Sequence, residues 1–231
     1  IELPNNEAFN IYDSESSSAQ PADELFNEQP PKPGRPHQYT IPNRSNSEMY
    51  IRNLKPATKN NYKKAFECFV KAANLGYAKA QEKVGEYYMR GKGVGIDHHK
   101  AFEFFQKAAD QGNEMAQYHL GICYKDGLGC KPSISAACRY FEESSKKGNS
   151  NAAYNLGLIY STSGKKNESF PFLKYAAENG HAIAQYMVGI LYEKGVGTEI
   201  DLKKAKEFLM MSAYNNNDQG QLCLGRFYKR H

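Results

Sequence analysis

The chain has 231 residues, 40% of them hydrophobic and 24% charged, and its formal net charge at pH 7 is +5. No apolar run approaches the roughly 20 residues of a membrane-spanning helix, so the sequence predicts no membrane span. The five cysteines are odd in number and form no Cys-x-x-Cys pair, which favours reduced thiols and a cytoplasmic location over a disulfide framework.

The first 60 residues differ from the rest of the chain. Residues 1–31 hold seven acidic side chains and no Lys or Arg, and four prolines stand from Pro30 to Pro36. Too little apolar surface is present there to offset the entropy of ordering, so residues 1–44 are predicted to be a disordered, acidic and Pro-rich arm. Ser45 and Glu48 have the spacing of a capping box, which predicts a short capping helix and linker over residues 45–60. Because the first residue is Ile1 and not Met, an upstream targeting segment or domain is left open.

A Gly-x-x-Tyr motif recurs through the remainder of the chain and sets its period. Successive motif glycines are 36, 36, 32 and 36 residues apart. Steps of this size are typical of helical repeat arrays, in which each unit stacks on its neighbours to build one long core. We therefore predict a repeat array over residues 61–231, with four full repeats and half units at both ends. The motif residues are Gly85 and Tyr88, Gly121 and Tyr124, Gly157 and Tyr160, Gly189 and Tyr192, and Gly225 and Tyr228.

Each repeat is predicted to contain two helices with the same faces and the same ends. In the first helix, a small residue and an aliphatic residue lie on the stripe of the motif, and in the second an alanine or serine precedes a large apolar residue by four positions. The third unit differs, because its connection from Tyr160 to Ser169 is four residues shorter and Lys165 stands at the cap position. In the other units Asn61, Asp97, Ser133 and Asp201 are placed to cap the second helix, and Gly76, Gly112, Gly148, Gly180 and Asn216 mark the turn after it.

Four blocks of the repeat resemble the Sel1-like repeat family, which is related to tetratricopeptide repeats. They are Ala-x-x-x-Leu-Gly-x-x-Tyr at 152–160, Gly-x-Gly-Val at 91–94, Lys-Ala-x-x-x-Phe at 100–105 and Lys-Ala-Ala-x-x-Gly at 107–112. The resemblance covers residues 61–231. It implies an all-α, right-handed superhelical solenoid of antiparallel helix pairs, with a scaffold or adaptor function, no catalytic activity and no cofactor.

A partner-binding surface is predicted by analogy with tetratricopeptide arrays, in which the first helix of each unit lines the concave face. The residues three before and one after each motif glycine then point inward. The middle units present tyrosines and aliphatic residues at these positions, and such anchors with a polar rim suit a partner peptide. The same side chains are equally compatible with packing of helix on helix. The predicted partner-binding residues are Glu82, Glu86, Tyr118, Ile122, Tyr154, Leu158, Tyr186, Ile190, Leu222 and Arg226.

Two other functions stay open on the sequence, namely an RNA-binding helical repeat and the regulatory tail of a larger multidomain signalling enzyme. Residues 32–231 carry 30 basic and 18 acidic side chains, but the inward positions form no continuous basic stripe, so RNA is the less favoured partner. No nucleophile is paired with a base, and the glycine loop at 91–95 follows no strand, so no nucleotide site is predicted. His119, Cys123 and Cys130 make no full ligand set, and no metal is predicted.

The last predicted helix, around Gly225 and Tyr228, has no second helix after it. We expect this helix to expose Leu224 and Phe227. An exposed end of this kind predicts either self-association through it or continuation of the natural chain.

Overall fold

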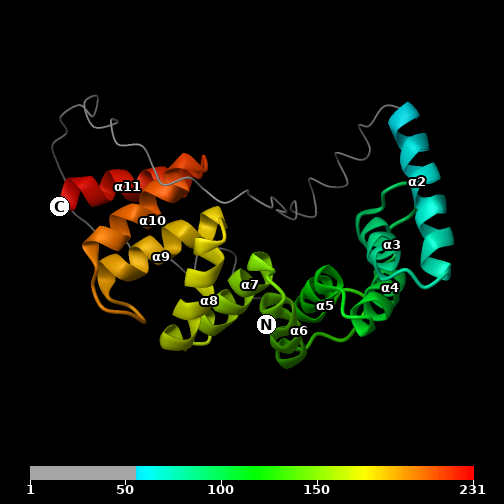
Figure 1. Cartoon of the computed structure of the whole chain (residues 1–231), viewed down its shortest axis with the longest axis horizontal. Helices are drawn as coiled ribbons and strands as arrows, with labels where there is room; N and C mark the ends of the chain where they lie inside the picture. Colours follow the sequence, from blue (N-terminus) through cyan, green and yellow to red (C-terminus); the bar gives the residue numbers. More distant parts are fainter. Residues whose placement is uncertain (1–55) are drawn as a thin grey trace.

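The computed structural model describes residues 56–231, which form ten α-helices and no strand (Figure 1). The predicted arm at 1–44 and the short helix predicted from Ser45 to Leu54 lie outside the described residues. The helices are α2 (Pro56–Asn74), α3 (Ala78–Arg90), α4 (His98–Asp110), α5 (Glu114–Asp126), α6 (Ile134–Lys146), α7 (Ser150–Thr162), α8 (Lys166–Glu178), α9 (Ala182–Lys194), α10 (Leu202–Tyr214) and α11 (Asp218–Arg230).

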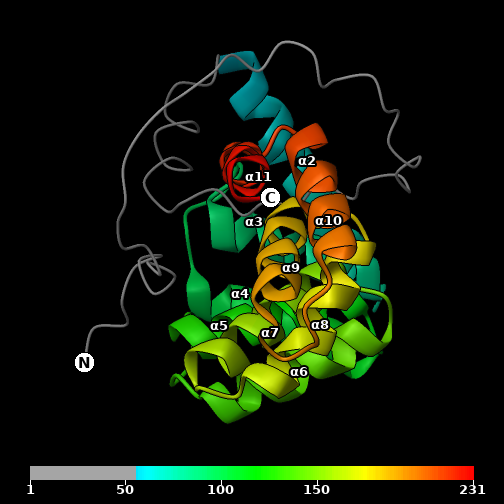
Figure 2. The same ribbon diagram turned by 90° about the vertical axis from the view of Figure 1, so that its left-hand side faces the viewer.

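The helices follow one another along an arc, with α2 at one end and α11 at the other (Figure 1). The most extensive packing is within the pairs α3 with α4, α5 with α6, α7 with α8, and α9 with α10, and each pair packs on the next. Seen from the end at which α11 lies, the pairs stack one behind another (Figure 2). The prediction of an all-α repeat solenoid is confirmed.

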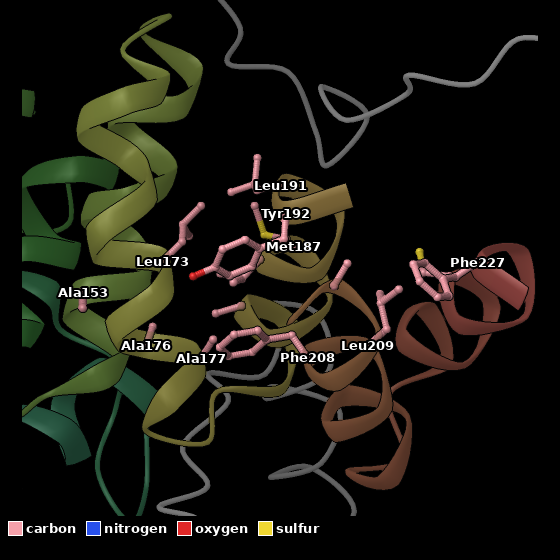
Figure 3. Packing of buried hydrophobic residues seen from close by; sticks show 14 residues of the cluster. Ala153, Leu173, Ala176, Ala177, Met187, Leu191, Tyr192, Phe208, Leu209 and Phe227 are labelled. Atoms are coloured by element: carbon pink, nitrogen blue, oxygen red, sulfur yellow. The ribbon is translucent and has the colours of Figure 1, made fainter. Parts of the chain in front are cut away.

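The motif glycines allow the two helices of a pair to approach closely. A Cβ atom on Gly121 would lie 2.5 Å from the ring of Phe141, and one on Gly85 would lie 2.6 Å from the ring of Phe105. Leu173 and Leu209 occupy the same place in the next two pairs, opposite Gly157 and Gly189. The motif glycine therefore faces the large residue of the second helix across each of these four pairs, and the large residues fill the core. Figure 3 shows the C-terminal part of this core, with Leu173, Met187 and Phe208 from three successive helices.

The first four motif tyrosines each stack on an aromatic ring of the helix that follows. The partners are Phe104 for Tyr88, Tyr140 for Tyr124, Phe172 for Tyr160 and Phe208 for Tyr192, with ring planes 8 to 20° apart. Offset stacking of this kind adds to the area buried. The aromatic partner stands one residue before the large residue that meets the glycine, so the whole motif serves the packing between helices.

The helix ends follow the predicted chemistry with one exception. The side chains of Asp97, Ser133 and Asp201 accept hydrogen bonds from backbone N–H groups of α4, α6 and α10, and Lys165 makes no such bond. The prediction that Asn61 caps a helix is wrong, because α2 begins at Pro56 and Asn61 lies within it.

A second row of caps, at the start of the first helix of each unit, escaped the sequence reasoning. Asn113, Asn149, His181 and Asn217 each accept a bond from the backbone three residues on, whereas Tyr77 at the same position accepts none. The turn just before this row has positive φ at every predicted glycine, and Asn216 takes φ 54° in place of glycine.

The last helix corrects a further expectation. Phe227 is only 5% exposed, because it packs into the C-terminal core, and Leu224 is half-buried against the same core. The exposed apolar residues of α11 are Leu222 and Tyr228. None of the described helices is long and apolar enough to cross a membrane.

Candidate functional site

The ten predicted partner-binding residues lie on α3, α5, α7, α9 and α11, and their exposure differs along the array. Four of them are buried, with 3 to 9% of each residue exposed, namely Glu82, Glu86, Tyr118 and Ile122. The later positions are partly exposed, because Tyr154, Leu158, Tyr186, Ile190 and Arg226 are half-buried and Leu222 is 46% exposed. The structure thus divides the row into a closed N-terminal half, which is buried, and an accessible C-terminal half, which is partly exposed.

Glu86 is held by three cations at the closed end of the row. Its carboxylate lies 2.9 Å from the ammonium of Lys83, 3.3 Å from that of Lys92 and 3.4 Å from the guanidinium of Arg90. Burial alone would raise the pKa of Glu86, but the hydrogen bond and charge of Lys83, followed by the charges of Arg90 and Lys92, lower it to about 2. Glu86 is therefore ionised and neutralised from within the chain at neutral pH.

Polar contacts join the first helices of successive units in this closed half. Glu82 of α3 lies 3.6 Å from Nε2 of His119 on α5, and the His119 ring stacks on Phe105 with ring centres 4.6 Å apart. One unit later, Tyr118 hydrogen-bonds to the side chain of Asn155 on α7, and burial raises the pKa of Tyr118 to about 12. In both cases, the residue three positions before the motif glycine of one unit contacts the residue two positions before the motif glycine of the next unit. Both predicted side chains thus contribute to the packing of one unit on another.

The accessible half begins at Tyr154, whose ring stacks on His181 with centres 4.1 Å apart. Burial raises the pKa of Tyr154, and the neighbouring phenol groups of Tyr186 and Tyr118 raise it further, so the three tyrosines lie near one another. His181 caps α9 by accepting a 3.2 Å hydrogen bond at Nδ1 from the backbone N–H of Ala184. Burial lowers the pKa of His181 to about 4, so its ring is neutral at pH 7.

We refer to the accessible residues as the inner C-terminal surface. It offers two phenol rings, three aliphatic side chains and one guanidinium group, which suits non-covalent binding of an apolar segment. Among residues 56–231 no three His, Cys, Asp or Glu side chains come together as metal ligands, and Cys123 is buried in an apolar cluster that raises its pKa. The inner C-terminal surface consists of Tyr154, Leu158, Tyr186, Ile190, Leu222 and Arg226.

Sequence reasoning missed the partners His119, Asn155 and His181. All three stand at fixed distances from a motif glycine or at the start of a first helix, but their side-chain types differ from unit to unit. A comparison of the same position across the units would have drawn attention to them.

The repeats match known family models over most of the described chain. The Sel1 repeat model matches residues 53–77 and 78–113, and a model described as plant tetratricopeptide repeats matches residues 128–228. The crystal structure of a Sel1 repeat protein from Oxalobacter formigenes superimposes with a TM-score of 0.67 and 26% identity, over 80% of this chain and 75% of that one. Residues 53–113 thus match the Sel1 repeat family, and the array as a whole has the fold of Sel1-like repeat proteins. Proteins with Sel1-like repeats generally act as protein-interaction scaffolds and are typically non-catalytic.

Two other relatives of this Sel1-like repeat chain are much longer than the part they share with it. The structure of c5321, a protective antigen of uropathogenic Escherichia coli with the same repeat fold, has a TM-score of 0.70 and 24% identity, over 81% of this chain and 40% of that one. The sel1-like repeat-containing protein L21 of Acanthamoeba polyphaga mimivirus is 38% identical over 58 residues, which are 25% of this chain. The match spans 11% of the length of L21.

Proposed function

We propose that this Sel1-like repeat chain is a non-catalytic scaffold whose inner C-terminal surface binds an extended peptide segment of a partner protein. The observation that carries the proposal is the accessibility of this half of the inner row. Tyr186 and Ile190 are half-buried and Leu222 is 46% exposed, whereas their counterparts Tyr118 and Ile122 are buried. Aromatic and aliphatic side chains that remain accessible on a rigid helical surface are the anchors that dominate binding energy at protein interfaces.

The test uses Leu222→Asp in the whole 231-residue chain, because Leu222 is 46% exposed and its replacement disturbs little packing. Ile200→Asp is the matched control, since Ile200 is a 66% exposed aliphatic residue in the loop before α10 and outside the surface. We expect proteins retained from native lysate by the wild-type chain to fall at least about tenfold with Leu222→Asp and to remain with Ile200→Asp. Circular dichroism checks that both variants are folded.

Equal retention by Leu222→Asp and wild type would refute binding at the inner C-terminal surface. Sedimentation of the same samples tests for self-association. A dimer that forms with the wild-type chain but not with Leu222→Asp would show that a second copy of the chain binds this surface. RNA binding receives less support, because Arg226 is the one cation of this surface. Tight RNA retention at physiological salt in a gel-shift assay would favour it instead.

A further inference from the structure

In three of the four complete units, the motif tyrosine meets a second ring besides the one it stacks on. Phe66 lies edge-on to Tyr88 with ring centres 5.2 Å apart. The same edge-on contact recurs for Phe102 with Tyr124 at 5.4 Å and for Phe170 with Tyr192 at 5.2 Å. The phenylalanine always comes from the helix that precedes the tyrosine. Each of these tyrosines is thus held between two rings.

A glycine loop covers the start of the helix that carries this phenylalanine. In the loop before α10, Gly197 sits where a Cβ atom would lie 2.7 Å from the carbonyl oxygen of Lys166 and 3.0 Å from Cβ of Phe170. Gly129 approaches the backbone at His98 and His99 at the start of α4 in the same way. In these units the loop glycine and the phenylalanine therefore lie at the start of the same helix.

The third unit departs from this pattern at several linked positions. Cys138 replaces the phenylalanine on α6, and the ring contacts of Tyr160 within the described chain are limited to its stack on Phe172. The loop that would cover the start of α6 is four residues shorter, and a Cβ atom on its Gly164 would have no neighbour within 4 Å. Ile134, the first residue of α6, is 45% exposed. A smaller side chain and a shortened loop thus leave apolar surface exposed at one place.

Three lysines flank this place in the sequence, Lys131 before α6 and Lys165 and Lys166 at the start of α8. Lys165 stands at the position of a capping Asp or Ser and has its ammonium 6.0 Å from the centre of the Tyr160 ring. Lys131, Lys165 and Lys166 form no ion pair with a described carboxylate. Glu142, which is close enough to influence the thiol of Cys138, is paired with Lys146 at 2.8 Å. The N-terminal end of α6 adds further positive potential.

We propose that the edge formed by Ile134, Cys138, Tyr160 and Lys165, which we term the α6 edge, binds a partner-protein segment that carries an aromatic residue flanked by carboxylates. The aromatic ring takes the edge-on place against Tyr160 that phenylalanine takes in the other units. The carboxylates pair with Lys165 and its basic neighbours, so the recognition rests on charge complementarity as well as on apolar contact. This site lies outside the inner C-terminal surface and does not depend on it.

The test titrates the 231-residue chain into an acetylated peptide, Asp-Gly-Asp-Phe-Asp-Gly-Asp, in which the phenylalanine carries a 4-fluoro label read by 19F NMR. We expect saturable line broadening that the unlabelled peptide reverses and a peptide with alanine at the central position does not. Cys138→Phe supplies the missing ring from within the chain and should weaken peptide binding at least about tenfold, with no loss of thermal stability. Lys165→Asp should weaken it at least about threefold.

Two further variants keep the result interpretable. Ile134→Glu changes an exposed residue, so the chain should fold normally and lose affinity by at least about fivefold. Lys203→Asp, an exposed lysine at the start of α10, is the matched charge control and should change affinity less than about twofold. The proposal is overturned by an absence of saturable binding at about 1 mM peptide, by equal competition from the alanine peptide, or by wild-type affinity in both Cys138→Phe and Ile134→Glu.

Discussion

Alanine at two of the motif glycines should have opposite effects on stability. Gly121 lies against Phe141, a fully buried side chain, and an added Cβ would be 2.5 Å from two atoms of its ring. Gly225 occupies the same place in the motif on α11, but a Cβ there would meet nothing within 4 Å. The two substitutions are chemically identical, so any difference between them reports the packing around each glycine.

The magnitudes follow from two terms. Alanine in a helix interior is favoured over glycine by about 1 kcal/mol, and both variants gain this term. Overpacking against a core side chain that cannot move costs about 3 kcal/mol, which is the upper end of the usual range for overpacking. Only Gly121→Ala carries this cost. We therefore expect Gly121→Ala to lower the free energy of unfolding by about 2 kcal/mol and Gly225→Ala to raise it by up to about 1 kcal/mol.

Urea denaturation followed by circular dichroism measures the free energies, and hydrogen exchange locates the effect. Because repeat arrays unfold unit by unit, the loss in Gly121→Ala should centre on α5 and α6, and the gain in Gly225→Ala on α11. In a chain of this size the melting temperature should fall by roughly 4 to 8 °C in Gly121→Ala. An unchanged Gly121→Ala, or a Gly225→Ala variant destabilised to the same degree, would refute this account of the motif.

Two cap positions give the remaining predictions. Tyr77 has the backbone conformation of Asn113 but no capping bond, so Tyr77→Asn should raise the free energy of unfolding by about 1 kcal/mol in urea; an unchanged midpoint would contradict this. The pKa of His181 is lowered from 6.5 to about 4 by burial, so the unfolded chain takes up a proton as pH falls from 6.5 to 4 and the folded chain does not. Stability contributed by the neutral ring is complete above pH 6.5 and falls by at most about 3 kcal/mol by pH 4. In His181→Asn, the asparagine should still cap α9, but the free energy of unfolding should no longer fall between pH 6.5 and 4 on account of this residue. If it falls as steeply with pH as in wild type, His181 is excluded as the source.

The repeat register allowed much of the fold to be predicted, because local chemistry repeats in it. Asp97 and Asp201 cap the helices they were expected to cap, and Gly112 and Gly148 take the left-handed conformation expected at a turn. The candidate site was less accessible to this reasoning. Tyr118 and Tyr186 occupy one register position and differ in exposure, since Tyr118 meets Phe141 and Asn155 from other helices. These neighbours lie 23 and 37 residues away in sequence, on the next two helices.

The sequence by itself determined the period, the two helices of each unit and the short connection in the third. Helix caps, turn glycines and apolar spacing act within a few residues, so they can be interpreted without knowing what lies opposite. The tertiary structure alone decided which ring each glycine faces, which inner tyrosines remain accessible, and that Cys138 and the short loop act at the same place. Those features depend on contacts between helices, and their geometry is set by how successive units stack.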